Sequence, residues 1–112
     1  MIQLTFSGTV LKINSIEVLL PYPITDAFVS LGIIIVFLDP DANMGKSGQY
    51  RNIIAYDTSG GKMWEAELPT SKSSDVYWKI TKKEPLVALS YSSYECEIDV
   101  ATGKIVRSEF YK

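Results

Sequence analysis

Two segments of the chain repeat one pattern of residues at a separation of 42 positions. Asp57 and Lys62 recur as Asp99 and Lys104, with glycine between the aspartate and the lysine in both segments. Each segment reads as a strand that ends in Asp, a glycine-containing turn and a second strand that opens with Lys. An internal repeat with a period of about 40–45 residues predicts an array of similar small sheets. The repeat constrains the architecture and indicates no activity.

Strand patterns dominate the remaining sequence. Ile33–Leu38 is an unbroken apolar run, mostly β-branched, which predicts a buried central strand. Residues 94–99 alternate between inward-facing and acidic side chains, so they predict a half-buried strand with Cys96 on its inner face. Further strands are expected at residues 2–6, 10–13, 16–20, 51–57, 63–68, 76–80, 86–91 and 105–111. Residues 24–30 fit either a short strand or a helical turn, and we favour the strand.

The two repeated turns carry a side-chain acceptor and a flexible residue at similar places. Asp57 precedes Gly60 and Gly61, and Asp99 precedes Gly103. An aspartate carboxylate accepts hydrogen bonds from the backbone of its own turn, and glycine adopts the positive φ that a tight reversal requires. We therefore assign these residues a structural role in two hairpins, in which Asp57 and Asp99 occupy equivalent places.

Length and composition define one small globular domain. The chain has 112 residues, of which 46% are hydrophobic and 21% charged, and such a chain buries one modest core. The strand pattern predicts an all-β fold, an antiparallel meander of about two four-stranded, propeller-like blades with an N-terminal hairpin. We place the hairpin at residues 1–22, the first blade-like unit at 23–68 and the second at 75–112.

The apolar strand Ile33–Leu38 also bears on assembly. Because it is apolar at every position, both of its faces must be covered, whereas a single meander leaves one face to solvent. The cover is the N-terminal hairpin, the other blade-like unit or a second chain. The first two are limited in area, so we predict a homodimer that involves this strand or a neighbouring edge.

The repeated segments resemble a known family. Pro23-Ile24, the strand at 33–36, residues 53–57 and the run from Gly60 to Trp64 look like one blade of a pyrroloquinoline-quinone-type β-propeller, and residues 86–107 look like part of a second. The resemblance implies four antiparallel strands per blade and a non-catalytic scaffold. The second unit departs from the pattern, because Val106 or Arg107 stands near the place of the family tryptophan. The quinone cofactor is not implied, since two blades are too few to close a ring.

Composition excludes several classes of function. The chain has no histidine and a single cysteine, which excludes His-based zinc sites, nucleophile–histidine pairs and an internal disulfide. The formal net charge of −2 gives no electrostatic reason to bind nucleic acid or an anionic membrane. No secretory signal is evident, and no segment has the ~20 apolar residues that cross a bilayer. We expect a cytoplasmic, bacterial protein that is not an enzyme and uses no cofactor.

The segment between residues 39 and 50 is rich in turn-forming residues and predicts a surface loop. We expect the chain to bind a protein partner through this loop or through an exposed sheet edge. One form of such a module is an immunity protein that blocks a toxin enzyme. The candidate contact residues in the loop are Asp39, Asp41, Asn43, Lys46 and Tyr50.

The alternative is a small-ligand or calcium-binding protein that uses the same loop. Asp39, Asp41 and Asn43 offer oxygen ligands at alternate positions, as calcium sites do. Met44 stands where an EF-hand loop needs glycine, and Tyr50 stands where it needs glutamate. These departures favour a polar loop over a calcium site.

Tyr77 and Trp78 are adjacent on a predicted strand, so their side chains point to opposite faces. One of the two is therefore expected in the core and the other at the surface. Cross-strand packing is the simpler role for both, but an exposed aromatic side chain also suits a protein contact.

Overall fold

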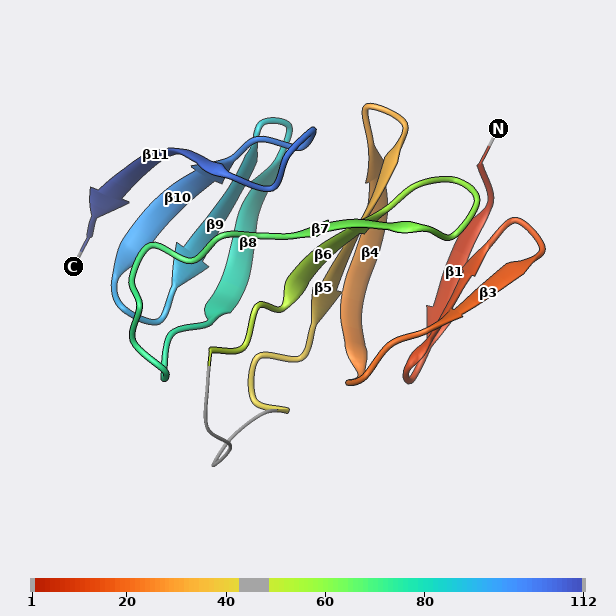
Figure 1. Cartoon of the computed structure of the whole chain (residues 1–112), viewed down its shortest axis with the longest axis horizontal. Coiled ribbons are helices and arrows are strands. Elements are labelled where there is room, and N and C mark those ends of the chain that lie inside the picture. The colour runs from red at the N-terminus through yellow and green to blue at the C-terminus, as the bar shows by residue number, and fades with distance from the viewer. Residues whose placement is uncertain (1, 43–48, 112) are drawn as a thin grey trace.

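The computed structural model describes residues 2–42 and 49–111, where all regular structure is β-strand (Figure 1). The strands of these residues are β1 (Leu4–Ser7), β2 (Val10–Ile13), β3 (Ile16–Leu19), β4 (Ile24–Ser30), β5 (Ile33–Leu38), β6 (Ile53–Tyr56), β7 (Lys62–Glu65), β8 (Tyr77–Lys83), β9 (Leu86–Ser90), β10 (Tyr94–Ile98) and β11 (Ile105–Phe110). They form three antiparallel sheets, so the predicted all-β fold class is confirmed. Within the described ranges there is no apolar helix long enough to span a bilayer.

Each sheet is an up-and-down meander of consecutive strands. The N-terminal sheet has the order β1-β2-β3, the middle sheet β4-β5-β6-β7 and the C-terminal sheet β11-β10-β9-β8. The middle and C-terminal sheets correspond to the two predicted four-stranded units. The N-terminal segment is a three-stranded sheet rather than a hairpin, because β3 pairs with β2 along its whole length. Residues 24–30 form strand β4, as favoured.

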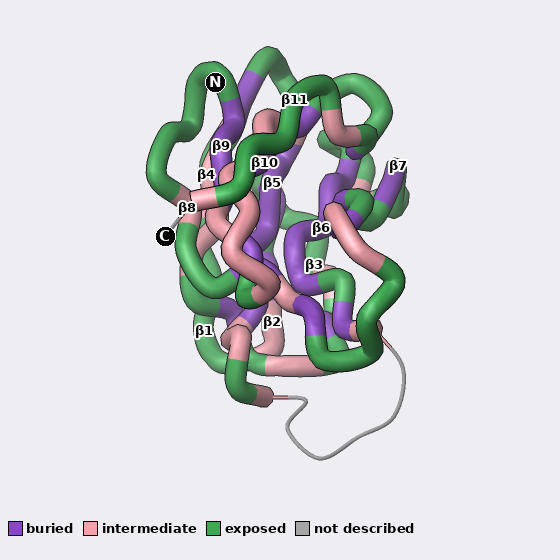
Figure 2. The backbone as a smooth tube through the Cα atoms, turned by 90° about the vertical axis from the view of Figure 1, so that its left-hand side faces the viewer, coloured by how far each residue is buried: buried purple, intermediate pink, exposed green. Residues whose placement is uncertain are grey.

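The middle sheet separates two hydrophobic cores. Ile35 and Phe37 of β5 belong to the core shared with the C-terminal sheet, whereas Ile34, Val36 and Leu38 belong to the core shared with the N-terminal sheet. Figure 2 shows β5 buried along nearly all of its length. Both faces of β5 are covered, as its composition predicts. Two sheets of the same chain supply the cover, so β5 does not require a second chain, and the homodimer stays a prediction.

A buried amide joins the middle and C-terminal sheets. Asn52 precedes β6 and donates from Nδ2 to the carbonyl oxygens of Leu38 at 3.1 Å and Tyr77 at 2.7 Å. Its Oδ1 accepts from the backbone N–H of Tyr77 at 3.1 Å. Tyr77 lies in the core and Trp78 at the surface, so the alternation assigned one residue to each environment correctly. Cys96 is buried in the same core, as expected.

The three sheets lie side by side, with the C-terminal sheet at one end (Figure 1). Only one of its faces therefore packs against another sheet. Ala88 and Cys96 are paired and point into the core, and their neighbours in each strand point the other way. We call that second surface the outer face. By strand register it carries Lys79, Lys82, Val87, Leu89, Glu95, Glu97, Arg107 and Glu109.

Candidate functional site

The repeated aspartates each cap the turn that follows them. Asp57 follows β6 and Asp99 follows β10, and each turn leads into the last strand of its sheet. Oδ1 of Asp57 accepts from the Ser59 hydroxyl at 2.7 Å and from the backbone N–H groups of Ser59 and Gly61 at 2.9 Å. The hydrogen bond from the Ser59 hydroxyl, followed by that from Gly61, lowers the pKa of Asp57. Asp99 accepts from the Ala101 N–H at 3.1 Å and the Thr102 hydroxyl at 3.0 Å.

The lysines of the repeat do not superimpose. The backbone N–H of Asp57 bonds to the carbonyl of Gly61, whereas that of Asp99 bonds to the carbonyl of Lys104, both at 2.8 Å. The second turn is therefore one residue longer. Lys62 already pairs with Tyr56 in its sheet, while Lys104 remains in the turn and Ile105 takes the paired place.

The turn glycines are required by their backbone and their neighbours. Gly60 and Gly103 have φ values of +88° and +76°, which only glycine adopts without strain. A Cβ on Gly60 would lie 3.1 Å from the side chain of Ile16 in the preceding sheet. A Cβ on Gly61 would lie 2.8 Å from Oδ2 of Asp57, so Gly61 leaves room for that carboxylate.

The candidate interaction loop is anchored rather than open at its two ends. Oδ1 of Asp39 accepts from the Asp41 N–H at 3.0 Å, and the carbonyl of Asp39 accepts from the Tyr50 hydroxyl at 2.9 Å. Tyr50 is buried, and its ring meets that of Tyr22 edge-on with 5.0 Å between centroids. Burial, followed by the charge of Asp39, raises the pKa of Tyr50 well above its usual value. Tyr50 thus holds the loop instead of presenting a contact.

Two residues considered for the loop, Asn43 and Lys46, lie outside the described residues. Of the oxygen ligands considered for calcium, the structure places only Asp39 and Asp41, and both take part in the turn that starts the loop. Among residues 2–42 and 49–111, no group of three Asp, Glu, His or Cys side chains is placed to hold a metal ion.

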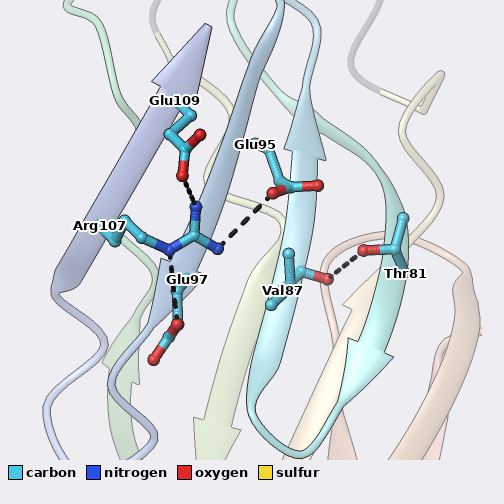
Figure 3. Close-up of polar contacts among 6 residues, drawn as sticks. All are labelled: Thr81, Val87, Glu95, Glu97, Arg107 and Glu109. Atoms are coloured by element: carbon cyan, nitrogen blue, oxygen red, sulfur yellow. Dashed lines mark hydrogen bonds and ion pairs between the residues drawn. The ribbon is translucent and has the colours of Figure 1, made fainter. Parts of the chain in front are cut away.

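An arginine of the edge strand β11 lies among three carboxylates of the outer face (Figure 3). The Arg107 guanidinium donates to the Glu109 carboxylate, and it lies 3.5 Å from an oxygen of Glu95 and 3.7 Å from one of Glu97. The hydrogen bond to Glu109 is the main cause of the raised pKa of Arg107. The alternation of the sequence places Glu95 and Glu97 on a charged face. It does not reveal that the neighbouring strand brings an arginine between them.

Arg107 occupies the position that Trp64 has in the middle sheet. Trp64 pairs with Ala55 next to the bulge at Met63, and Arg107 pairs with Glu97 next to the corresponding bulge. The Trp64 side chain reaches the following sheet, where its Nε1–H donates to the carbonyl of Val100 at 2.9 Å. Arg107 instead contacts carboxylates of its own sheet. The outer face of the C-terminal sheet therefore carries charged side chains.

Aromatic side chains gather where β9 turns into β10. Trp78, Tyr91 and Phe110 are 43%, 71% and 65% exposed. The Trp78 Nε1–H donates to the Tyr111 hydroxyl at 3.0 Å, and the Phe110 ring meets that of Tyr94 edge-on with 5.5 Å between centroids. We call these five residues the aromatic end. The sequence indicated an exposed aromatic at position 77 or 78, but not the cluster, which is assembled from β8, β10, β11 and a turn.

Asp75 and Cys96 are two buried ionisable residues of the C-terminal half of the chain. Asp75 is buried and accepts from the Thr70 hydroxyl at 2.7 Å and the Ser92 hydroxyl at 3.0 Å, so it ties the connection before β8 to the β9–β10 turn. Cys96 lies in the core, where burial raises the pKa of its thiol. A protonated, enclosed thiol is not a nucleophile. Asp75 therefore joins two connections, and Cys96 is a side chain of the core.

A family model matches residues 1–110 of the chain, and the family is described as a domain of unknown function (DUF7957). No curated protein matches the chain, and no solved structure does.

Proposed function

We propose that this chain, which belongs to the DUF7957 family, is a non-catalytic protein-interaction module. It binds its partner through the aromatic end. The observation that carries the proposal is the exposure of Trp78, Tyr91 and Phe110 at one end of one sheet. Exposed aromatic side chains at one end of a sheet suit a protein contact, because Trp and Tyr are enriched among interface hot spots.

The aromatic end is ordered before any partner arrives. Trp78 is held by its hydrogen bond to Tyr111, whose hydroxyl also donates to the carbonyl of Ser90 at 3.3 Å. Phe110 is held by its edge-on contact with Tyr94. Side chains that are fixed in the free protein lose less conformational entropy on binding. This preorganisation supports a docking role over incidental exposure.

The surroundings of the aromatic end have the character of an interface rim. The adjoining outer face carries three basic residues, Lys79, Lys82 and Arg107, and three acidic residues, Glu95, Glu97 and Glu109. The two signs balance, so long-range attraction contributes little and aromatic contacts must supply the affinity. Phe110 also ends the edge strand β11, so a partner at this end meets an exposed sheet edge. We therefore expect binding that depends only weakly on salt.

The test is capture of a partner from the native host with the full chain as bait. Tyr91→Ser and Trp78→Ala should each abolish capture, because each removes an exposed aromatic contact. The matched control is Leu19→Ser, which removes a side chain that is 76% exposed on the far sheet. This control should retain capture. Thermal melting confirms that all variants are folded.

Capture that survives both aromatic substitutions would contradict the proposed surface. Capture that is lost equally in the Leu19→Ser control would contradict it as well, because the partner would then contact another sheet. The chain that carries both Tyr91→Ser and Trp78→Ala serves as the negative control for specific capture. If the wild-type chain and this double variant capture the same proteins, the proposed function itself is wrong.

A further inference from the structure

We propose that a groove at the other end of the C-terminal sheet binds a small organic cation, an alkylammonium group on an apolar chain. The groove lies between the β4–β5 turn, the β8–β9 turn and the end of β10, and has a volume of about 420 Å³. That is the size of a small-ligand site. In Figure 1 these turns lie at the end of the sheet remote from the β9–β10 turn. The groove contains no residue of the aromatic end, so this inference does not depend on the proposed function.

A buried hydroxyl without a partner faces the groove. Ser30, the last residue of β4, is 1% exposed, and its Oγ makes no hydrogen bond to any described residue. Ser30 pairs with Ile33, which packs against the core between the middle and C-terminal sheets. Paired residues point to the same side of a sheet, so Ser30 faces the gap between these sheets, where the groove opens. Buried polar atoms are rarely left unpaired, and a bound group would satisfy this one.

Among the described residues, the charged members of the lining are Glu84, Glu97 and Asp99, and none is basic. By strand register the Glu97 side chain points to the outer face, where Arg107 lies 3.7 Å away, and Asp99 accepts hydrogen bonds within its own turn. Glu84, by contrast, makes no hydrogen bond or ion pair with a described residue. A concave site with an unpaired carboxylate at its wall attracts cations and repels anions.

The neighbouring lysine does not neutralise this site. Lys83 precedes Glu84 in the chain, but its Nζ lies 3.5 Å from a carboxylate oxygen of Asp26 and 4.7 Å from the centroid of the Phe28 ring. It is thus held against β4. The negative charge of Glu84 at the β8–β9 turn remains available to a ligand.

The other walls suit an aliphatic chain. Leu86 and Ile98 are buried in the lining, and Leu31 and Val106 stand exposed in it. Leu31 lies in the β4–β5 turn, where it lines the groove. Its φ of 52° is a costly backbone conformation for a bulky residue. An ammonium group near Ser30 and the carboxylates, followed by a short hydrocarbon along Leu31 and Val106, matches this distribution of polar and apolar groups.

Amide chemical shifts of the full chain, followed during titration, test the inference with three probes of one chain length: n-butylammonium, n-butanol and butyrate. We expect n-butylammonium to shift the amides of Leu31, Leu86 and Asp99 saturably. Butanol and butyrate should bind about tenfold more weakly or not at all, because they lack the charge or reverse it. A fourth probe, Nα-acetyl-lysine methylamide, shows whether the natural ligand is a lysine side chain of a protein or a free amine. Binding tighter than that of n-butylammonium indicates a protein lysine, and equal or weaker binding indicates a free amine.

Two variants test the polar contacts of the groove, and a third on another sheet is the control. Ser30→Ala and Glu84→Gln should each weaken n-butylammonium binding about fivefold, as expected for the loss of one hydrogen bond or charge contact. Glu17→Gln, on the far sheet, should leave it unchanged. Equal binding of butanol, unchanged affinity in both groove variants, or no saturable shift with any probe would each overturn the inference. A crystal structure with n-butylammonium would place the nitrogen near Ser30 if the inference holds.

Discussion

The indole of Trp64 lies against Gly103 of the next sheet, so closely that a Cβ on this glycine would be 2.5 Å from the ring. The Trp64 Nε1–H donates to the carbonyl of Val100 in the same turn. Glu67, two residues after β7, adds a backbone hydrogen bond to the carbonyl of Gly103 at 2.9 Å. The end of the middle sheet is thus fastened to the β10–β11 turn, and this contact sets how the two sheets meet.

Gly103→Ala should therefore destabilise the fold strongly. It places a Cβ in the Trp64 ring and imposes a positive φ on alanine, so we expect a loss of about 2–4 kcal/mol in the free energy of unfolding. The matched control is Gly32→Ala, because Gly32 has a φ of +77° but a Cβ added there would meet no described atom within 4 Å. The control should cost only about 1–2 kcal/mol. Urea denaturation measures the stability loss of both variants. Equal losses would show that backbone strain alone accounts for the requirement for glycine at position 103.

Asn52→Ala should also be costly, because it leaves buried backbone groups of Leu38 and Tyr77 without their partner. We expect a loss on the order of 3 kcal/mol. Ser30→Ala provides the contrast, since it removes a buried polar atom that has no described partner and should leave stability unchanged or higher. A small loss for Asn52→Ala in the same urea assay would mean that water replaces the bridge.

Asp57 should titrate below its ordinary pKa of 3.8, since the Ser59 hydroxyl and backbone amides stabilise its charged form. The folded pKa lies below the unfolded one, so this contribution to stability is present above the unfolded pKa. It is lost as the pH falls through the folded pKa. Ser59→Ala should raise the pKa of Asp57, whereas Ser73→Ala should not change it. Carboxyl-carbon NMR titration decides, and an unshifted pKa in Ser59→Ala would remove the assigned cause.

Cys96 should not react with a thiol reagent at pH 8 while the protein is folded. Its side chain is fully buried and burial raises the pKa of the thiol, so little thiolate forms and none is accessible. In denaturing urea the same thiol should react stoichiometrically within the mixing time. Rapid labelling of the native protein would indicate that the core between the middle and C-terminal sheets opens readily.

Local pattern determined the strands and turns of this protein. The period of two at 94–98 and the apolar run at 33–38 identified β10 and β5, because side-chain alternation is a property of a single strand. Asp57 and Asp99 indicated their hairpins for the same reason, since each carboxylate bonds within its own turn. The lysine match was misleading by one residue, because the lengths of the two turns differ.

The tertiary structure decided what covers each sheet and which surface remains free. The groups that carry the two proposals are assembled from different sheets or strands: Ser30 faces Leu86 across a sheet gap, and Trp78 meets Tyr111 across the C-terminal sheet. The members of each pair are far apart in the chain, so no periodic pattern in the sequence predicts that they meet. Both cores of β5 likewise come from contacts between distant segments, which is why the composition of that strand demanded cover without revealing its source.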